Sequence, residues 1–409
     1  MLTLGVGRAA RHTELPAILD GSMSLYDFDA VEPSALPDSL TPVFINYVAR
    51  HGARYLTSEN KVKACEKWLS KAREAGTLTK EGKDFMRLLA GVREATDGQW
   101  GMLSPIGKAQ ELRLGREMAQ MYPALFGAKG ASVNSVASYV PRVIETMDQF
   151  TIAIADIHEG IQTTASSGRS YDKLTRFFVT DSVYDAWRHT GAWREVYDDF
   201  VARMVPTAPA ERLVGKNSGL SDKDLKKLSY DMYKVLQGMR AASLPAPTTE
   251  WMTEDEYRRC WEATNLEKYF QYSISPLSTV PAAGACNLLY YLLHTETLLL
   301  QGELQPGLAG VFGHAETLLP FFSLIGVPGT TAMPLDYDRL PAEWSDAELT
   351  PLAANLAIIY SRSASGHLYA SMRLNGRNIS PINDPAQLTV PIQQLHDYWL
   401  NRIHQLLPH

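Results

Sequence analysis

The sequence has little cysteine and no long apolar run. Its three cysteines, Cys65, Cys260 and Cys286, lie far apart and include no CxxC pair. At most one disulfide can form, so neither a disulfide framework nor a cysteine-rich zinc site holds this fold together. The longest apolar run, residues 288–300, is interrupted by polar residues and falls short of the roughly 18 to 20 residues of a transmembrane helix. We therefore expect no membrane span.

The chain also lacks a surplus of positive charge, because its net charge is −6 over 409 residues. This charge argues against nucleic acid or an anionic membrane as the main partner. It leaves room for an anionic small molecule, which a basic pocket on an acidic surface can bind. Residues 1–8 contain no basic segment followed by an apolar one, so no secretory signal is visible. The Gly5-x-Gly7 pattern has no strand before it, which excludes a dinucleotide site.

Residues 50–54 read Arg-His-Gly-Ala-Arg and follow a strongly apolar run at 43–49. That run has the length and composition of a strand buried on both faces, so the five residues should lie at its carboxyl end, where ligands bind in open α/β sheets. The two arginines offer planar forks of donors that suit a tetrahedral oxyanion. Gly52 is expected to let a ligand approach the backbone. His51 is then either a further donor or a nucleophile for phosphorus.

A second candidate for binding an anion is Arg142. A β-like stretch at 131–139 leads into Pro141, which is a favourable first residue of a helix. Arg142 then falls in the first helical turn, where free backbone amides and the helix dipole favour an anion. The alternative is a solvated arginine paired with Glu145, three residues further along the same helix.

A third polar segment, His314 to Glu316, follows a predicted strand at 308–312. His-Ala-Glu also begins the signature of zinc-dependent nucleobase deaminases, but these need P-C-x-x-C downstream, and no cysteine follows Cys286. A metal held by these residues and His51 is disfavoured by the two neighbouring arginines. We expect no metal and no other cofactor. Signatures of zincins, P-loop NTPases and typical serine hydrolases are also absent.

With these three segments the sequence resembles the histidine acid phosphatases, and within them the bacterial multiple inositol polyphosphate phosphatases. Their signatures are Arg-His-Gly-x-Arg early in the chain and His-Ala-Glu late, and the resemblance covers residues 40–150 and 300–325. It implies hydrolysis of phosphomonoesters such as phytate through a phosphohistidine on His51. Glu316 would protonate the leaving alkoxide and then activate water. The resemblance assigns the scissile phosphate to four side chains: Arg50, Arg54, Arg142 and His314.

Two other activities remain open on these residues: a broad-specificity acid phosphatase, and a phosphoglycerate-mutase-like phosphotransferase with the same histidine nucleophile. A phosphate-binding protein without catalysis is a third alternative, although it would need neither His51 nor an acid at Glu316. The resemblance further implies a periplasmic or secreted location. We expect a monomer whose partner is a polyanionic small molecule.

The expected fold class is α/β, with a doubly wound mixed sheet like that of phosphoglycerate mutases and an inserted all-helical domain. The core would comprise residues 1–150 and 276–409, and the insert 151–275, where no convincing strand is seen. Lys173 and Arg176 in the insert are candidates for binding outlying phosphates, the alternative being a solvated basic face. Helices are expected over 58–74, 79–94, 105–122, 182–204, 221–242, 253–272, 283–300 and 390–406, and late strands over 353–361 and 367–374.

Overall fold

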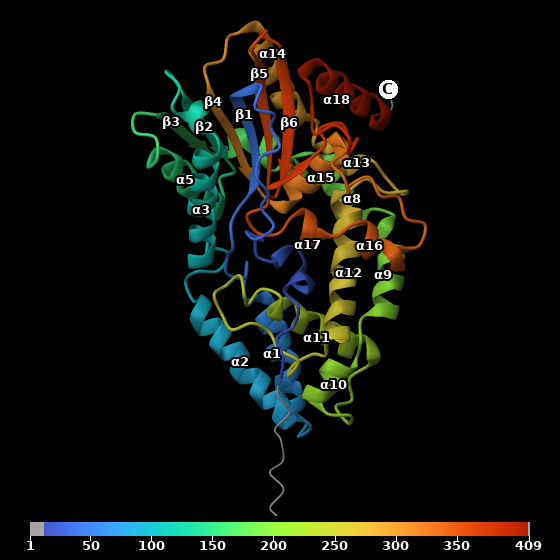
Figure 1. The fold of residues 1–409 in the computed structure, drawn as a ribbon. Coiled ribbons are helices and arrows are strands. Elements are labelled where there is room, and N and C mark those ends of the chain that lie inside the picture. Colours follow the sequence, from blue (N-terminus) through green and yellow to red (C-terminus); the bar gives the residue numbers. More distant parts are fainter. Residues whose placement is uncertain (1–11, 408–409) are drawn as a thin grey trace, which may run out of the picture.

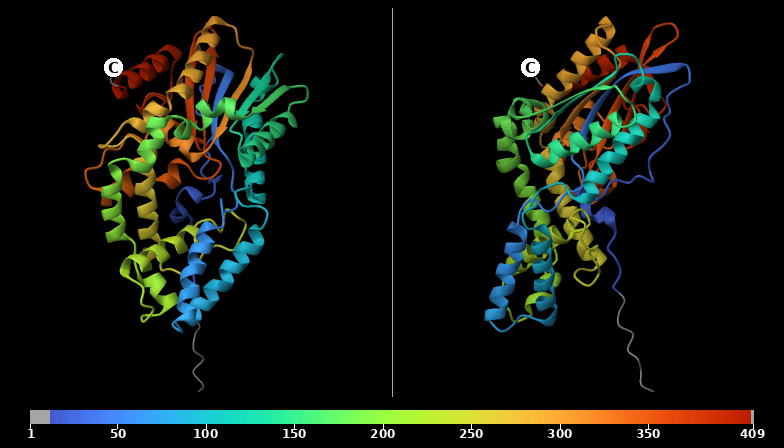
Figure 2. Two further views of the ribbon diagram at one scale, coloured as in Figure 1. Left: turned by 180° about the vertical axis from the view of Figure 1, so that it is seen from behind. Right: turned by 90° about the vertical axis from the view of Figure 1, so that its left-hand side faces the viewer.

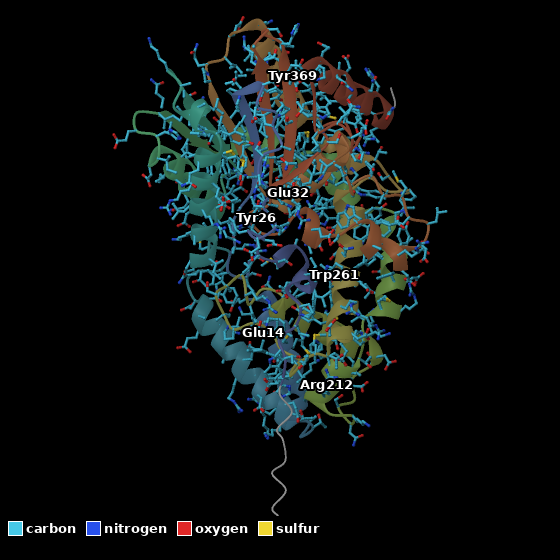
Figure 3. All side chains as sticks on the ribbon, in the orientation of Figure 1. Glu14, Tyr26, Glu32, Arg212, Trp261 and Tyr369 are labelled. Atoms are coloured by element: carbon cyan, nitrogen blue, oxygen red, sulfur yellow. The ribbon has the colours of Figure 1, made fainter. Side chains whose placement is uncertain are left out.

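The computed structural model describes residues 12–407. The N-terminal segment considered above for a secretory signal and a dinucleotide pattern lies outside the described residues. Figure 1 shows a sheet flanked by helices at one end of the molecule and a bundle of helices at the other. The labelled side chains in Figure 3 mark the two parts: Tyr369 lies in the sheet, and Arg212 lies in the helical bundle.

In the described residues eight strands form one mixed sheet, in the order β3-β2-β4-β1-β5-β6-β7, with β8 paired to β6. The strands are β1 (Leu40–Arg50), β2 (Ser132–Ala137), β3 (Gln162–Ser167), β4 (Gly307–Gly313), β5 (Asn355–Ser363), β6 (Leu368–Leu374), β7 (Arg377–Ile379) and β8 (Thr389–Pro391). Strands β3, β2, β4 and β1 are parallel, whereas β5 and β6 run antiparallel to their neighbours. The predicted mixed α/β sheet is confirmed.

Strand β1 is central because it is buried on both faces. Ile45 and Tyr47 pack into a cluster with side chains of α3 (Pro105–Met121) and α5 (Pro141–Ala155). The alternate residues, such as Val48, join a second cluster with α14 (Cys286–Gln301), α15 (Ala315–Ile325) and α18 (Ile392–Leu406). This alternation follows from the period of two along a strand. Figure 2 shows the sheet between these helices.

The helical part collects segments from several places in the sequence. Helix α1 packs on α11, and α2 packs on α10, so residues on both sides of position 150 contribute to it. The division into core and insert at 150 and 275 remains a proposal. The longer helices here are α1 (Asn60–Glu74), α2 (Lys80–Thr96), α8 (Ser182–Thr190), α9 (Trp193–Met204), α10 (Ala208–Val214), α11 (Asp222–Leu236) and α12 (Glu254–Tyr272). The short elements are η1 (Ala17–Met23), α4 (Pro123–Phe126), η2 (Arg169–Tyr171), α6 (Asp172–Thr175), α7 (Phe177–Thr180), α13 (Val280–Gly284), η3 (Tyr337–Arg339), α16 (Leu340–Glu343) and α17 (Asp346–Leu349).

Several helices begin at residues whose side chains cap the first turn. The Ser104 side chain accepts a hydrogen bond from the amide of Gly107 at 3.3 Å, and Pro105 occupies the first turn. Ser221 and Thr253 each form a capping box. After β6 the chain turns at Asn375 and Gly376, which both have positive φ, as a two-residue hairpin of type I′ requires.

Three expectations were wrong. Strand β3 lies within the segment where no strand was expected. All six of its residues are exposed, so it lacks the apolar alternation that predicts a strand. The helix expected over 182–204 is two helices, because the backbone becomes extended at Gly191. The helix expected to reach 242 ends at Leu236.

None of the helices in residues 12–407 is long and apolar enough to cross a membrane. All three cysteines are free thiols, with Cys65 and Cys260 buried. The fold therefore rests on its apolar core and hydrogen bonds without a disulfide.

Candidate active site

The carboxyl ends of three neighbouring parallel strands bring the predicted residues together. Arg50 is the last residue of β1 and pairs in register with Gly313, the last residue of β4. The amide of His51 donates to the carbonyl of Gly313 at 3.2 Å. The imidazole rings of His51 and His314 lie 5.6 Å apart, measured between their centres. The expected convergence at one edge of the sheet is therefore present.

His51 has the geometry of a neutral nucleophile. Its Nδ1 lies 2.9 Å from the carbonyl oxygen of Gly52, and a carbonyl only accepts, so Nδ1 carries the proton and Nε2 keeps a free lone pair. Burial, followed by the charges of Arg142 and Arg50, lowers the pKa of His51 well below its usual value. These effects favour the neutral form of the imidazole.

The loop that carries His51 is fixed by the helices on either side. The amide of Gly52 donates to Thr146 Oγ1 of α5 at 3.1 Å, and the amide of Ala53 donates to Gln110 Oε1 of α3 at 2.9 Å. A Cβ atom at Gly52 would lie 2.7 Å from the carbonyl oxygen of Gly107. The structure thus corrects the expected reason for this glycine, since the missing side chain makes room for α3.

Arg50, Arg54 and Arg142 are cations without a carboxylate partner. In the described residues their hydrogen bonds go to backbone carbonyls or to His314, and none forms an ion pair with an acidic side chain. The Nε of each is buried without a hydrogen-bond partner. Burial and the repulsion from the other two arginines lower the pKa of Arg54 to about 9. Buried guanidinium donors that are positively charged and have no partner require an anionic ligand.

Arg142 occupies the predicted first turn of α5, and the alternative pairing with Glu145 is wrong. Glu145 forms its ion pair with Lys108 at 2.6 Å. The Nη2 of Arg142 instead lies 3.5 Å from His314 Nδ1. The other ring nitrogen of this histidine, Nε2, lies 3.1 Å from Ser138 Oγ. Burial lowers the pKa of His314 to about 3, which makes it a neutral hydrogen-bonding group here.

Glu316 lies in the first turn of α15, directly after β4. Burial alone would raise the pKa of Glu316, but His314, the helical backbone amide, Arg50 and Lys268 outweigh that effect and lower it to about 2. Without a bound anion the carboxyl is ionised. It is the one acidic side chain of the predicted set, and it faces a surplus of positive charge.

The structure brings one of the two candidates from residues 151–275 to this site. Arg176 donates from Nη1 to the hydroxyl of Tyr139, its guanidinium lies 4.6 Å from the centre of that ring, and its charge acts on Arg142. Arg169 lies over the same ring at 4.4 Å. Lys173 is exposed, and within the described residues no hydrogen bond or ion pair joins it to the site.

Four supporting residues were missed from the sequence: Ser138, Thr146, Lys268 and Asp346. Ser138 could have been found by its position, because it directly follows β2. The last two residues carry no local signal, since only the folded chain places them near Arg50 and Glu316. Among residues 12–407 no group of three or more His, Cys, Asp or Glu is arranged to hold a metal ion.

The chain is similar to known proteins in its sequence and in its fold. The family model described as "Histidine phosphatase superfamily (branch 2)" matches residues 43–369. The solved structure of the multiple inositol polyphosphate phosphatase of Bifidobacterium longum with inositol hexasulfate is similar with a TM-score of 0.78 and 16% identity, covering 92% of this chain and 96% of the other.

Two phytases share the fold at lower similarity. The phytase of D. castellii is similar with a TM-score of 0.70 and 16% identity, covering 95% of this chain and 85% of the other. The Hafnia alvei phytase in complex with myo-inositol hexakis sulphate has a TM-score of 0.53 and 13% identity, covering 91% of this chain and 100% of its own. At these identities the structures establish the fold.

Proposed function

We propose that this chain, which belongs to branch 2 of the histidine phosphatase superfamily, hydrolyses inositol polyphosphates such as phytate through a phosphohistidine on His51. The observation that carries the proposal is a neutral imidazole with a free Nε2 beside three arginines that have no carboxylate partner. A nucleophile next to a surplus of positive charge is what attack on an anionic phosphate requires.

In the first step Arg50, Arg54 and Arg142 bind the scissile phosphate and stabilise its equatorial oxygens as they gain charge. His314 adds a hydrogen bond. The Nε2 of His51 attacks phosphorus, so that an N–P bond forms while the P–O bond to the inositol breaks. The leaving alkoxide takes a proton from Glu316.

Glu316 must gain that proton before it can serve as the acid. His314, the helical backbone amide, Arg50 and Lys268 together lower its pKa to about 2, but a bound phosphate brings negative charge that offsets the charges of Arg50 and Lys268. Phosphate binding should therefore raise the pKa of Glu316, so that the carboxyl takes up a proton from solvent or from the phosphate monoanion. In the second step Glu316 accepts a proton from water, which attacks phosphorus and releases His51 and inorganic phosphate.

The preference for a polyphosphorylated substrate is supported by a further basic group. Arg176, stacked on Tyr139 at the edge of the site, would bind a phosphate that is not being transferred. The two solved relatives with inositol hexasulfate and myo-inositol hexakis sulphate support the same substrate class. Further choice among substrates would reside in the helical part. A periplasmic or secreted monomer fits this role.

The test is release of inorganic phosphate from phytate by the purified chain, with EDTA present because no metal is required by the proposed chemistry. Hydrolysis with a kcat/KM for phytate well above that for p-nitrophenyl phosphate supports the proposal. Equal efficiency on both would favour a broad-specificity acid phosphatase. Transfer of phosphate to an acceptor sugar acid, without release to water, would favour a phosphotransferase, and binding without turnover would leave only a phosphate-binding protein.

A further inference from the structure

We propose that Asp346, a buried aspartate outside the catalytic motifs, is a positioning residue that holds Arg50 in place for the scissile phosphate. The inference rests on the role proposed above for Arg50. It concerns a link between the helical part of the molecule and the catalytic end of β1, which neither the Arg-His-Gly-x-Arg nor the His-Ala-Glu segment contains.

The orientation of Arg50 depends on two carbonyls that come from distant parts of the chain. Its Nη1 donates to the carbonyl of Ser22 at 2.5 Å and to that of Thr350 at 2.6 Å. These bonds occupy both hydrogens of Nη1. The Nε is buried without a partner, and Nη2 is likewise left for a ligand. The two carbonyls therefore decide where the free donors point.

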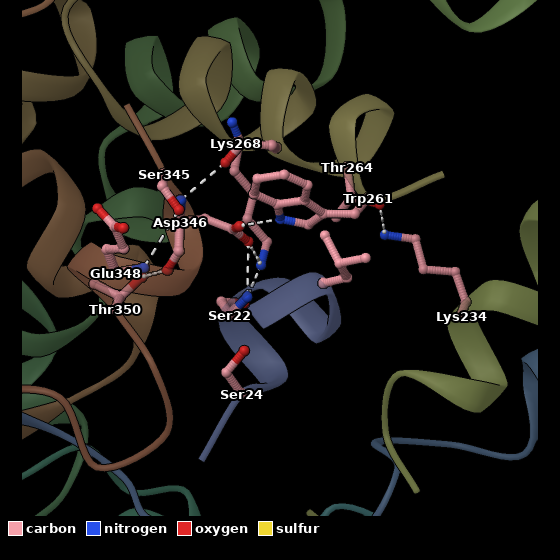
Figure 4. Close-up of polar contacts among 12 residues, drawn as sticks. Ser22, Ser24, Lys234, Trp261, Thr264, Lys268, Ser345, Asp346, Glu348 and Thr350 are labelled. Carbon is pink, nitrogen blue, oxygen red and sulfur yellow. Dashed lines mark hydrogen bonds and ion pairs between the residues drawn. The ribbon is translucent and has the colours of Figure 1, made fainter. Parts of the chain in front are cut away.

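Asp346 positions both of those carbonyls. Its Oδ2 accepts a hydrogen bond from the amide of Ser22 at 2.9 Å. Its own carbonyl accepts from the amide of Thr350 at 3.0 Å and from the hydroxyl of the same residue at 3.3 Å. Figure 4 shows Asp346 between Ser22 and Thr350, with bonds to both. A shift of Asp346 would move the two acceptors together.

The carboxylate is itself held by helix α12. Trp261 Nε1 donates to Oδ1 at 3.0 Å, and Lys268 Nζ donates to Oδ2 at 2.8 Å. The amide of Asp346 donates to Asn265 Oδ1 at 2.8 Å. Asp346 is 0% exposed, so its charge is balanced within the protein by Lys268. Trp261, Lys268 and Asn265 of α12 thus hold Asp346 in place, and Asp346 in turn positions Arg50.

The same cluster has an electrostatic effect on the reacting groups. The charge of Asp346 favours the protonated form of Arg50, and the charge of Lys268 favours the ionised form of Glu316. A purely structural aspartate would hold α12, α17 and η1 together without either effect. A positioning role predicts in addition that the cost of losing Asp346 depends on the presence of Arg50.

The experiment is a double-mutant cycle that joins Asp346→Asn with Arg50→Ala. Asparagine keeps the shape but places an amide group near the donors of Ser22 and Lys268. We expect Asp346→Asn to lower kcat on both phytate and p-nitrophenyl phosphate by about 10 to 100-fold, and by less than about 3-fold when Arg50 is already alanine. Equal fractional losses in the two backgrounds, or an unchanged kcat, would overturn the proposal.

The matched control is Asp20→Asn. Asp20 is also 0% exposed and lies on η1, but it accepts hydrogen bonds from Tyr257 at 2.7 Å and Arg240 at 3.0 Å, and no contact joins it to Arg50 in the described residues. We expect it to lower the melting temperature and to change kcat by less than about 3-fold. A loss of kcat equal to that of Asp346→Asn would mean that any loosening of η1 stops the enzyme, which overturns the specific role.

A second variant covers the case in which Asp346→Asn does not fold. Trp261→Phe removes one donor to the carboxylate and keeps its charge, so it should reduce kcat by a few-fold only when Arg50 is present. An unchanged kcat in this variant would count against the proposal. Failure of the proposed function is distinguishable because it is seen in the wild type, either as no release of phosphate or as equal efficiency on phytate and p-nitrophenyl phosphate. Failure of this inference instead leaves the wild type active on phytate and the variants unaltered.

Discussion

Two glutamates on consecutive helices, Glu296, which is buried, and Glu316, which is half-buried, have pKa values shifted in opposite directions. Glu296 of α14 accepts from the hydroxyl of Tyr360 at 3.1 Å and lies 3.1 Å from His396 Nδ1, and burial raises its pKa to about 8. Glu316 of α15 has a pKa lowered to about 2, although burial acts on it in the same direction. The difference is that His314, the helical backbone amide, Arg50 and Lys268 favour the ionised form of Glu316 and outweigh the effect of burial.

The comparison shows which part of the molecule is built for an anion. Glu296 has two hydrogen-bonding neighbours, Tyr360 and His396. Near Glu316, by contrast, the buried Nε donors of the three arginines remain without partners. In the helical part, Arg240 is paired with Asp20 and Lys61 is paired with Asp231. Uncompensated charge is costly, so its concentration at one edge of the sheet indicates a ligand of opposite sign.

The largest expected effect comes from removing the nucleophile while leaving that positive charge in place. His51→Ala should abolish turnover, by about 10⁵-fold or more, and should retain binding of inorganic phosphate because the arginines remain. A labelled, acid-labile phosphoenzyme that can be trapped with the wild type but not with the variant would show that His51 is the nucleophile. An unaltered melting curve is the control for folding, and full activity would contradict the assignment of His51.

The second effect separates the acid from the phosphate-binding groups. An inositol alkoxide needs a proton as the P–O bond breaks, whereas nitrophenolate leaves with little help. Glu316→Gln should therefore lose about 10² to 10⁴-fold in turnover of phytate and much less with p-nitrophenyl phosphate. Equal losses on the two substrates would remove Glu316 from the role of leaving-group acid.

Arg142→Ala should show the opposite pattern. The phosphoryl group that Arg142 binds is common to both substrates, so kcat/KM should fall by a similar factor for each, about 10² to 10³-fold. The matched control is Arg113→Ala, because Arg113 on α3 is exposed and pairs with Glu117 at 2.7 Å. A loss restricted to phytate would place Arg142 at a second phosphate.

The sequence predicted the edge of the sheet well because local signals mark it. The strands that end at positions 50, 137 and 313 are each followed by polar residues, and parallel strands bring such ends together. The helices expected from positions 105 and 221 begin within one residue of those positions, next to the capping residues Ser104 and Ser221. The ends of these strands and helices are determined by residues adjacent in the sequence, so the sequence alone is enough to predict them.

What the sequence could not predict depends on long-range packing. Ser22 and Asp346 are separated by 324 positions, yet share a hydrogen bond. No periodicity marks the polar strand β3, and the contribution of α1 and α2 to the helical part appears only in the fold. The reason for Gly52 was also wrong, because the helix it contacts comes from later in the chain.

The smallest expected effect is on stability and concerns Glu296. Its pKa is about 8 in the folded state and about 4.3 when unfolded, so between these values the folded state holds a proton that the unfolded state has lost. The free energy of unfolding should therefore fall as the pH rises from about 5 to 8, by up to about 1.4 kcal/mol per pH unit from this group.

Glu296→Gln should remove that contribution, while Glu303→Gln, at an exposed site just after α14, should not. Urea denaturation at pH 5, 6, 7 and 8 measures the slope for each variant. Parallel slopes for Glu296→Gln and the wild type would mean that Glu296 is ionised in the folded protein, and the contrast between the two glutamates would then be lost.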